Sequence, residues 1–80
     1  MATSVVELDA TAVDVVVTED FLRVTLADGR ELSAPVAWFP RLRNASEAQR
    51  SVWRFIGRGQ GIHWPEVDED ISVASLLRSN

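Results

Sequence analysis

The chain has 80 residues, of which 46% are hydrophobic and 25% are charged; this balance fits one globular domain and excludes wholesale disorder. No apolar run approaches the ~20 residues of a membrane-spanning helix, so we expect no membrane partner. The absence of cysteine excludes a disulfide framework and any thiolate metal site, and it makes the cytoplasm the expected location.

The formal net charge of −4 is distributed unevenly. Residues 1–40 carry −5, residues 41–58 carry +4 and residues 59–80 carry −3, and every basic residue is an arginine. The acidic balance repels a phosphate backbone at long range, which argues against direct nucleic-acid binding. The arginine-rich middle keeps such binding open locally, although a solvated surface of mixed charge is the simpler interpretation.

Apolar and polar residues alternate in three consecutive segments. The alternating apolar residues are Val13, Val15 and Val17, then Leu22, Val24 and Leu26, then Leu32, Ala34 and Val36. A period of two is typical of strands with one buried face, so the pattern predicts a three-stranded antiparallel meander. Asp28-Gly29 predicts a hairpin turn between the second and third strands, because glycine adopts positive φ at little cost. Pro35 has no N–H for a ladder, which places it at a strand end or a sheet edge.

A capping box follows, because Ser46 can accept from the N–H of Gln49 while the Gln49 side chain reaches back. We predict a helix from residue 47 to residue 55 or 56, ended by a left-handed cap at Gly57. Its apolar stripe consists of Ala48, Val52, Phe55 and Ile56. A three-stranded sheet needs a cover in water, and this stripe is the predicted one. Truncation of Val52 or Phe55 is therefore expected to unfold the domain.

The last third of the chain predicts two short elements. Residues 62–65 are expected to form a short fourth strand. The carboxylates of residues 68–70 suit the positive end of a helix dipole, and Ser72 can cap a final short helix through Leu77.

These elements place the chain in the α+β class: a three-stranded antiparallel meander, a covering helix, a short fourth strand and a short C-terminal helix. We expect residues 1–9 to form a partly ordered N-terminal segment and residues 10–80 to form a single α+β domain.

Two segments contain residue types that bind ligands in other proteins. The loop at 57–61 has three glycines, but it follows the predicted helix and matches no phosphate-loop spacing, so we interpret it as a cap and a tight entry into a strand. His63 and the acids at 68–70 suit a divalent metal or acid–base chemistry, but the spacing of a known metal motif is missing and structural roles account for them. We assign no catalytic, cofactor-binding or metal-ligating residue and expect a protein that is not an enzyme.

Tryptophan and arginine dominate the energetics of protein interfaces, and both are concentrated between residues 38 and 64. The candidate partner-binding residues are Trp38, Arg41, Arg50, Trp53, Arg54, Arg58 and Trp64. The three tryptophans are also expected to close the edges of the core. Trp53 flanks the apolar stripe, where it either seals the core or contacts a partner. The open sheet edge at Pro35 offers strand addition or homodimerisation as a second route.

Several strings resemble a known family. They lie at residues 26–30, 38–42 and 45–50, and above all at 57–73, which includes Gly-Ile-His-Trp-Pro and Asp-Glu-Asp-Ile-Ser. The chain resembles the bacterial domain-of-unknown-function 2442 family over about residues 10–77. The resemblance implies a small α+β fold with no assigned activity and no catalytic residues to transfer. It also implies that the gene for this chain lies beside the gene for another small protein, in an arrangement that looks like a toxin–antitoxin pair.

The leading hypothesis is a non-enzymatic protein-interaction module in the cytoplasm, the antitoxin-like or regulatory member of such a gene pair. Its acidic balance suits a basic protein partner, such as the product of a neighbouring gene. The alternative is a nucleic-acid-associated transcriptional regulator that uses an arginine-rich helix face, with Arg50 and Arg54 on the predicted helix. The arginines that it would use are Arg41, Arg43, Arg50, Arg54 and Arg58. The resemblance implies a domain that occurs alone or ahead of a helix-turn-helix segment, and we expect none here, which argues against direct operator binding. Either function is compatible with a homodimer.

Overall fold

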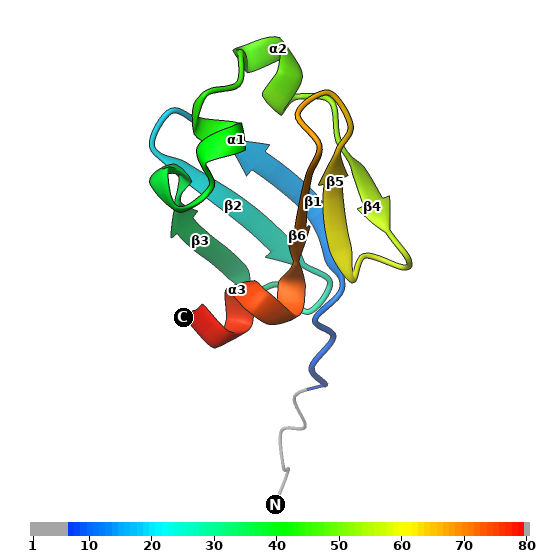
Figure 1. Ribbon diagram of the computed structural model, residues 1–80. Helices are drawn as coiled ribbons and strands as arrows, with labels where there is room; N and C mark the ends of the chain where they lie inside the picture. The colour runs from blue at the N-terminus through cyan, green and yellow to red at the C-terminus, as the bar shows by residue number, and fades with distance from the viewer. Residues whose placement is uncertain (1–6, 80) are drawn as a thin grey trace, which may run out of the picture.

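The computed structural model describes residues 7–79, which form two three-stranded antiparallel sheets with short helices at both ends (Figure 1). The predicted α+β class is confirmed. Of the predicted N-terminal segment, residues 1–6 lie outside the described residues.

The first sheet is the predicted meander. It consists of β1 (Ala12–Val17), β2 (Phe21–Leu26) and β3 (Glu31–Pro35), in that order. Every neighbouring pair is antiparallel, and Leu22 and Val24 of the central strand are fully buried. The period of two therefore identified the three strands, and it identified the buried face of β2 and β3.

One position of the first strand differs from the pattern. Val13 was expected on the buried face, but it is 53% exposed. The register of β1 against β2 shifts between Ala12 and Asp14, so that Ala12 takes the buried position. A bulge of this kind adds one residue to one strand and breaks the alternation there.

The β2–β3 turn holds the segment that precedes β1. Gly29 has a φ of 94°, as the predicted Asp-Gly turn requires. Asp28 accepts hydrogen bonds from the backbone N–H of Asp9 at 2.9 Å and from Arg30 Nε, and its carboxylate lies 2.8 Å from Arg30 Nη2. The hydrogen bonds from Arg30 lower the pKa of Asp28 from 3.8 to about 2.

After β3 the chain forms a short 3₁₀ helix, η1 (Val36–Trp38), and two single-turn helices, α1 (Pro40–Arg43) and α2 (Glu47–Arg50). The predicted capping box begins α2: Gln49 N–H donates to Ser46 Oγ, and Ser46 N–H donates to Gln49 Oε1. The helix ends at Arg50, however, and not at residue 55 or 56.

The covering helix predicted over residues 47–56 is therefore wrong. Residues Arg54–Ile56 form strand β4, and Val52 and Ile56 are 46% and 39% exposed. Val52, Phe55 and Ile56 are β-branched or aromatic, which lowers helix propensity and favours extended backbone. Because the segment is extended, Gly57 ends a strand and caps no helix.

The cover is instead a second sheet, in which β4 pairs with β5 (Gly61–Trp64) and β5 pairs with β6 (Glu69–Ser72). The predicted fourth strand is confirmed as β5. The acids at 68–70 were expected to begin a helix, and this prediction is wrong, because residues 69 and 70 lie in β6.

The predicted C-terminal helix is α3 (Val73–Ser79). Ser72 begins it, and its hydroxyl accepts from Ser75 N–H at 3.0 Å.

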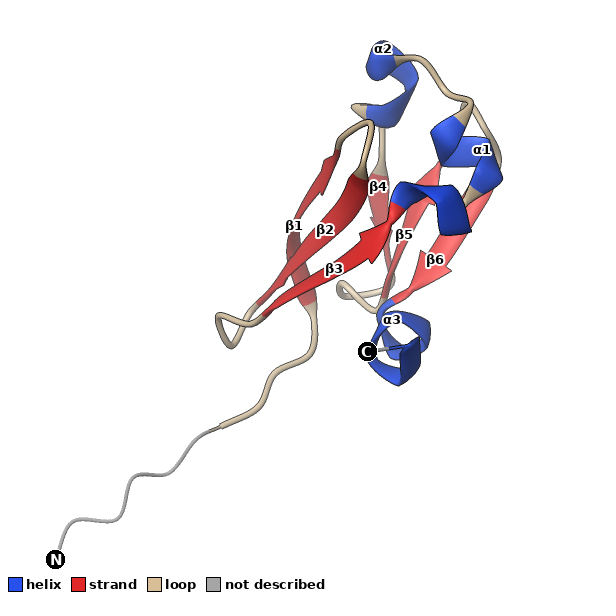
Figure 2. Cartoon of the chain, turned by 90° about the vertical axis from the view of Figure 1, so that its left-hand side faces the viewer, coloured by secondary structure: helices blue, strands red, loops and turns tan. Residues whose placement is uncertain are grey.

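The two sheets face each other and enclose the core (Figure 2). Trp64 and Ile62 of β5 are fully buried, in one cluster with Leu22, Val24 and Leu26 of β2. Helices α1 and α2 lie at one end of the molecule with the β1–β2 and β5–β6 turns, and α3 lies at the opposite end (Figure 1). We call the first of these the α1–α2 end.

Candidate protein-interaction surface

The structure distributes the seven predicted partner-binding residues over several places. Trp64 is fully buried between the sheets, and its indole N–H donates to the carbonyl of Arg50 at 3.1 Å. It cannot contact a partner in this fold, so its assignment as a partner-binding residue is wrong. A tryptophan on a short strand gives no sequence signal that separates a core position from an interface position.

Arg50 has a structural role. Its Nε donates to the carbonyl of Leu42 and its Nη2 to the carbonyl of Arg43, both at 2.9 Å. These carbonyls belong to the last residues of α1, where helical partners are missing. Arg50 therefore joins α2 to α1 with two of its five donors.

The arginine-rich helix face does not exist. Arg50 lies in α2 and Arg54 lies in β4, so helical spacing does not relate them. Arg58 is exposed in the β4–β5 turn, at the end of the molecule opposite α1 and α2 (Figure 1). The prediction that Arg50 and Arg54 share a helix face is therefore wrong.

Trp53 is half-buried beside β4. Its ring centroid lies 5.0 Å from that of Phe55, at an interplanar angle of 57°. Both rings pack against the core cluster. Trp53 thus contributes to the edge of the core, which is the first of the two alternatives predicted for it.

Trp38 and Arg41 lie at the α1–α2 end. The Trp38 side chain is 54% exposed. The preceding Val36 N–H donates to the carbonyl of Asp20 at 2.9 Å, which fixes η1 beside the β1–β2 turn. Arg41 Nη1 donates to the carbonyl of Asp68 in the β5–β6 turn, so it links α1 to that turn.

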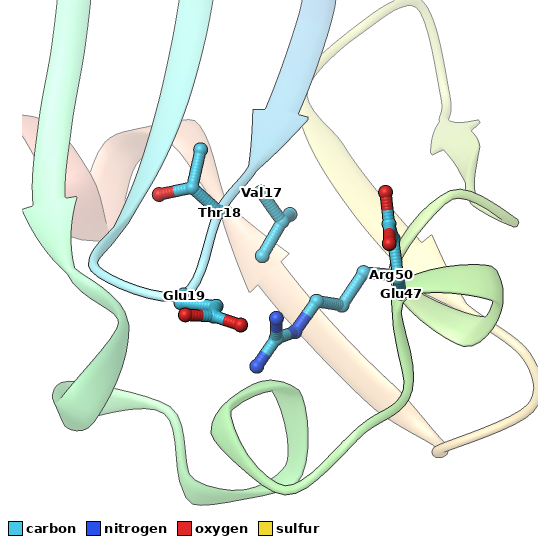
Figure 3. A pocket seen from close by; sticks show the side chains of 5 residues that line it. All are labelled: Val17, Thr18, Glu19, Glu47 and Arg50. Atoms are coloured by element: carbon cyan, nitrogen blue, oxygen red, sulfur yellow. The ribbon is translucent and has the colours of Figure 1, made fainter.

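A cavity of about 280 Å³ opens at the same end, lined by Val17, Thr18, Glu19, Glu47 and Arg50 (Figure 3). The guanidinium of Arg50 and the carboxylate of Glu19 point toward one another across it. Within residues 7–79, neither Glu19 nor Glu47 forms an ion pair. Glu19 and Glu47 bring two negative charges to the cavity against the one positive charge of Arg50, which also binds backbone carbonyls, so the cavity has an acidic character. Sequence reasoning missed this cavity, because its residues come from segments about 30 positions apart.

His63 and Asp70 are register partners on β5 and β6, and His63 Nδ1 contacts Asp70 Oδ1. In the described part of the chain, no group of three His, Cys, Asp or Glu residues is placed to hold a metal ion. The pair lies directly across two neighbouring strands, so it has a sufficient role as a cross-strand contact.

The glycine-rich loop joins β4 to β5. Gly57 and Gly59 have φ angles of 62° and 81°, which favour glycine. A Cβ on Gly59 would lie 2.5 Å from the carbonyl oxygen of Ala12, whose N–H donates to the Gly59 carbonyl at 2.7 Å. These glycines therefore serve a tight turn that touches β1, in agreement with a structural interpretation of the loop.

None of the helices within residues 7–79 has both the length and the apolar character needed to cross a membrane.

Comparison with known proteins gives a family and a fold. A crystal structure of a protein of unknown function from Rhodospirillum rubrum is similar, with a TM-score of 0.72, 25% sequence identity and coverage of 86% of each chain. No curated protein matches the chain. The family described as "Protein of unknown function (DUF2442)" matches residues 12–80. The two sheets and short helices form the small α+β fold that the resemblance implied. The chain belongs to this family.

Proposed function

We propose that this chain is a non-enzymatic protein-interaction module that binds a basic protein partner at its α1–α2 end. The observation that carries the proposal is the exposure of Trp38, at 54%, in helix η1, whose first residue Val36 is hydrogen-bonded to Asp20 of the acidic β1–β2 turn. In this position the tryptophan exposes apolar surface to water. Tryptophan is among the residues that contribute most to binding when a partner covers them. Trp38 is the proposed anchor of the interface.

The acidic cavity defines the chemistry of the partner. Glu19 and Glu47 line it without an ion-pair partner among the described residues, and the adjacent Asp20 is exposed. Arg50 is committed to the carbonyls of α1. A lysine or arginine side chain of the partner would supply the missing positive charge, and such complementarity favours fast and specific association. The net charge of −4 acts in the same direction at long range.

The gene arrangement implied by the family resemblance suggests the source of the partner. We propose the product of a neighbouring gene, with this chain as the antitoxin-like or regulatory member of the pair. The absence of cysteine supports a cytoplasmic complex.

Co-expression of the tagged chain with the neighbouring gene product, followed by purification and titration calorimetry, tests the proposal. We expect a complex that Trp38→Ala and Glu19→Lys each weaken about tenfold or more, because they remove the anchor and reverse a cavity charge. Arg58→Ala is the matched control, since Arg58 is exposed at the opposite end, and it should leave the affinity unchanged. No complex at micromolar concentrations would contradict the proposal.

A further inference from the structure

The outward edge of β3 carries unpaired backbone groups. Val36 N–H donates to the carbonyl of Asp20, and Leu26 N–H donates to the carbonyl of Arg30. The backbone N–H and C=O groups of the even-numbered residues in this segment therefore point toward β2. The N–H and C=O groups of Glu31 and Ser33 therefore point away from the sheet. No residue among 7–79 forms a hydrogen bond with them, and Figure 2 shows β3 in front with no other element across it.

We propose that β3 pairs antiparallel with β3 of a second copy of this chain, which joins the two β1–β3 sheets into one six-stranded sheet. Glu31 and Ser33, the two residues with outward N–H groups, can pair with the same two residues of a second copy. With Leu32 on the two-fold axis, Glu31 of each copy lies opposite Ser33 of the other, and the two pairs exchange four N–H···O=C hydrogen bonds. Open edges of this kind are templates for pairing with another chain.

The ends of β3 limit the pairing to a discrete dimer. In this register Pro35 lies beyond the four hydrogen bonds, where its missing N–H costs nothing. It falls opposite Gly29 in the β2–β3 turn of the second copy, where the strand has ended. The ladder therefore cannot extend, which distinguishes a dimer from open-ended aggregation.

Charge complementarity selects a second copy and this register. Arg23 of β2 is the register partner of Ser33, and its Nε lies 3.9 Å from Glu31 Oε2 of the same chain. In the dimer Arg23, Ser33 and Glu31 of the second copy lie in a row across three strands, on the same exposed face. Only the small Ser33 lies between the two charged side chains. Two arginines and two glutamates then alternate around the axis. A two-fold axis through Glu31 would instead place two carboxylates opposite each other.

The dimer goes beyond the proposed function, because the cavity at the α1–α2 end takes no part in it. Binding of the basic partner and self-association can each fail without the other. The first is measured with the neighbouring gene product, and the second is measured with this chain alone.

Analytical ultracentrifugation of the chain from about 10 μM to about 1 mM tests the proposal. We expect the mass to approach that of a dimer as concentration rises. Ser33→Pro removes an edge N–H that has no partner in the monomer, so it should leave a folded monomer. Ser33→Ala keeps that N–H and should still dimerise. A wild-type chain that stays monomeric at about 1 mM, or a folded Ser33→Pro variant that dimerises as wild type does, overturns the proposal.

A charge exchange tests the register. Arg23→Glu and Glu31→Arg should each raise the Kd of the dimer about tenfold, because each places like charges side by side, and the double variant should restore it. Failure of the double variant to restore dimerisation would contradict the register. Should Ser33→Pro not fold, hydrogen exchange of the wild type decides: the Glu31 and Ser33 amides must be protected more strongly at high concentration than at low concentration. Equal exchange at both concentrations would overturn the dimer.

Discussion

The indole N–H of Trp64 donates a hydrogen bond of 3.1 Å to the backbone carbonyl of Arg50. The guanidinium of Arg50 then donates to the carbonyls of Leu42 and Arg43. A fully buried residue of the second sheet is thereby connected to both helices of the α1–α2 end. The proposed partner surface depends on this core contact, although Trp64 itself never reaches a partner.

Trp64→Phe should destabilise the domain by about 2–4 kcal/mol, because it leaves a void and an unpaired carbonyl at Arg50. Urea unfolding followed by circular dichroism measures the change. Trp38→Phe is the matched control, since Trp38 is mostly exposed, and it should stay within about 0.5 kcal/mol of wild type. Equal effects of the two changes would show that Trp64 is not the buried tryptophan.

Gly59→Ala should destabilise the fold by about 3 kcal/mol or more, because a Cβ there meets the β1 backbone and the φ of 81° is strained for alanine. Gly57→Ala shares the positive φ, but its Cβ meets only the flexible side chain of Gln60, at 3.1 Å. It should cost about 1–2 kcal/mol. Thermal unfolding of both variants compares them, and a larger loss for Gly57→Ala would place the loop differently against β1.

Val52→Ala should change the free energy of unfolding by no more than about 0.5 kcal/mol, because Val52 is 46% exposed. Ile62→Ala removes a fully buried side chain and should cost about 2–5 kcal/mol. Urea unfolding of the pair distinguishes the observed fold from the covering helix that the sequence favoured. If Val52→Ala unfolded the domain, that result would contradict the observed fold and support the covering helix.

The pKa of Asp28 is lowered from 3.8 to about 2, first of all by the side-chain hydrogen bond from Arg30. Because the folded pKa lies below the unfolded one, the stabilisation is present above pH 3.8 and is lost as the pH falls through about 2. The carboxyl carbon of Asp28, followed by NMR, should titrate near pH 2. Arg30→Ala should raise that midpoint toward 3.8, and a wild-type midpoint already near 3.8 would contradict the contact.

Local patterns were sufficient for most of the meander and for the helix starts at Ser46 and Ser72. The alternation in β2 and β3, the Asp28-Gly29 turn and the capping box at Ser46 depend on residues close in sequence, and each is present in the structure. The bulge at Ala12 escaped prediction, because its cause is the pairing of β1 with β2.

The second sheet could not be derived in the same way. Ala48, Val52, Phe55 and Ile56 fit a helical stripe, while the half-buried Trp53 and Phe55 around the exposed Arg54 also fit a strand. The choice depends on whether β5 and β6 are available to pair, which local sequence does not reveal. The assignment of Trp64 to a partner surface failed for the same reason, since only the packing of the two sheets buries it.

Cross-strand nuclear Overhauser contacts in residues 51–63 test most directly the claim that a sheet, and not a helix, covers the meander. The observed fold predicts backbone contacts between Phe55 and Ile62 and between Arg54 and His63, which are register partners. It also predicts that contacts between residues three positions apart stop after Arg50. Helical contacts that continue to Ile56, without the cross-strand set, would contradict the fold and the surfaces built on it.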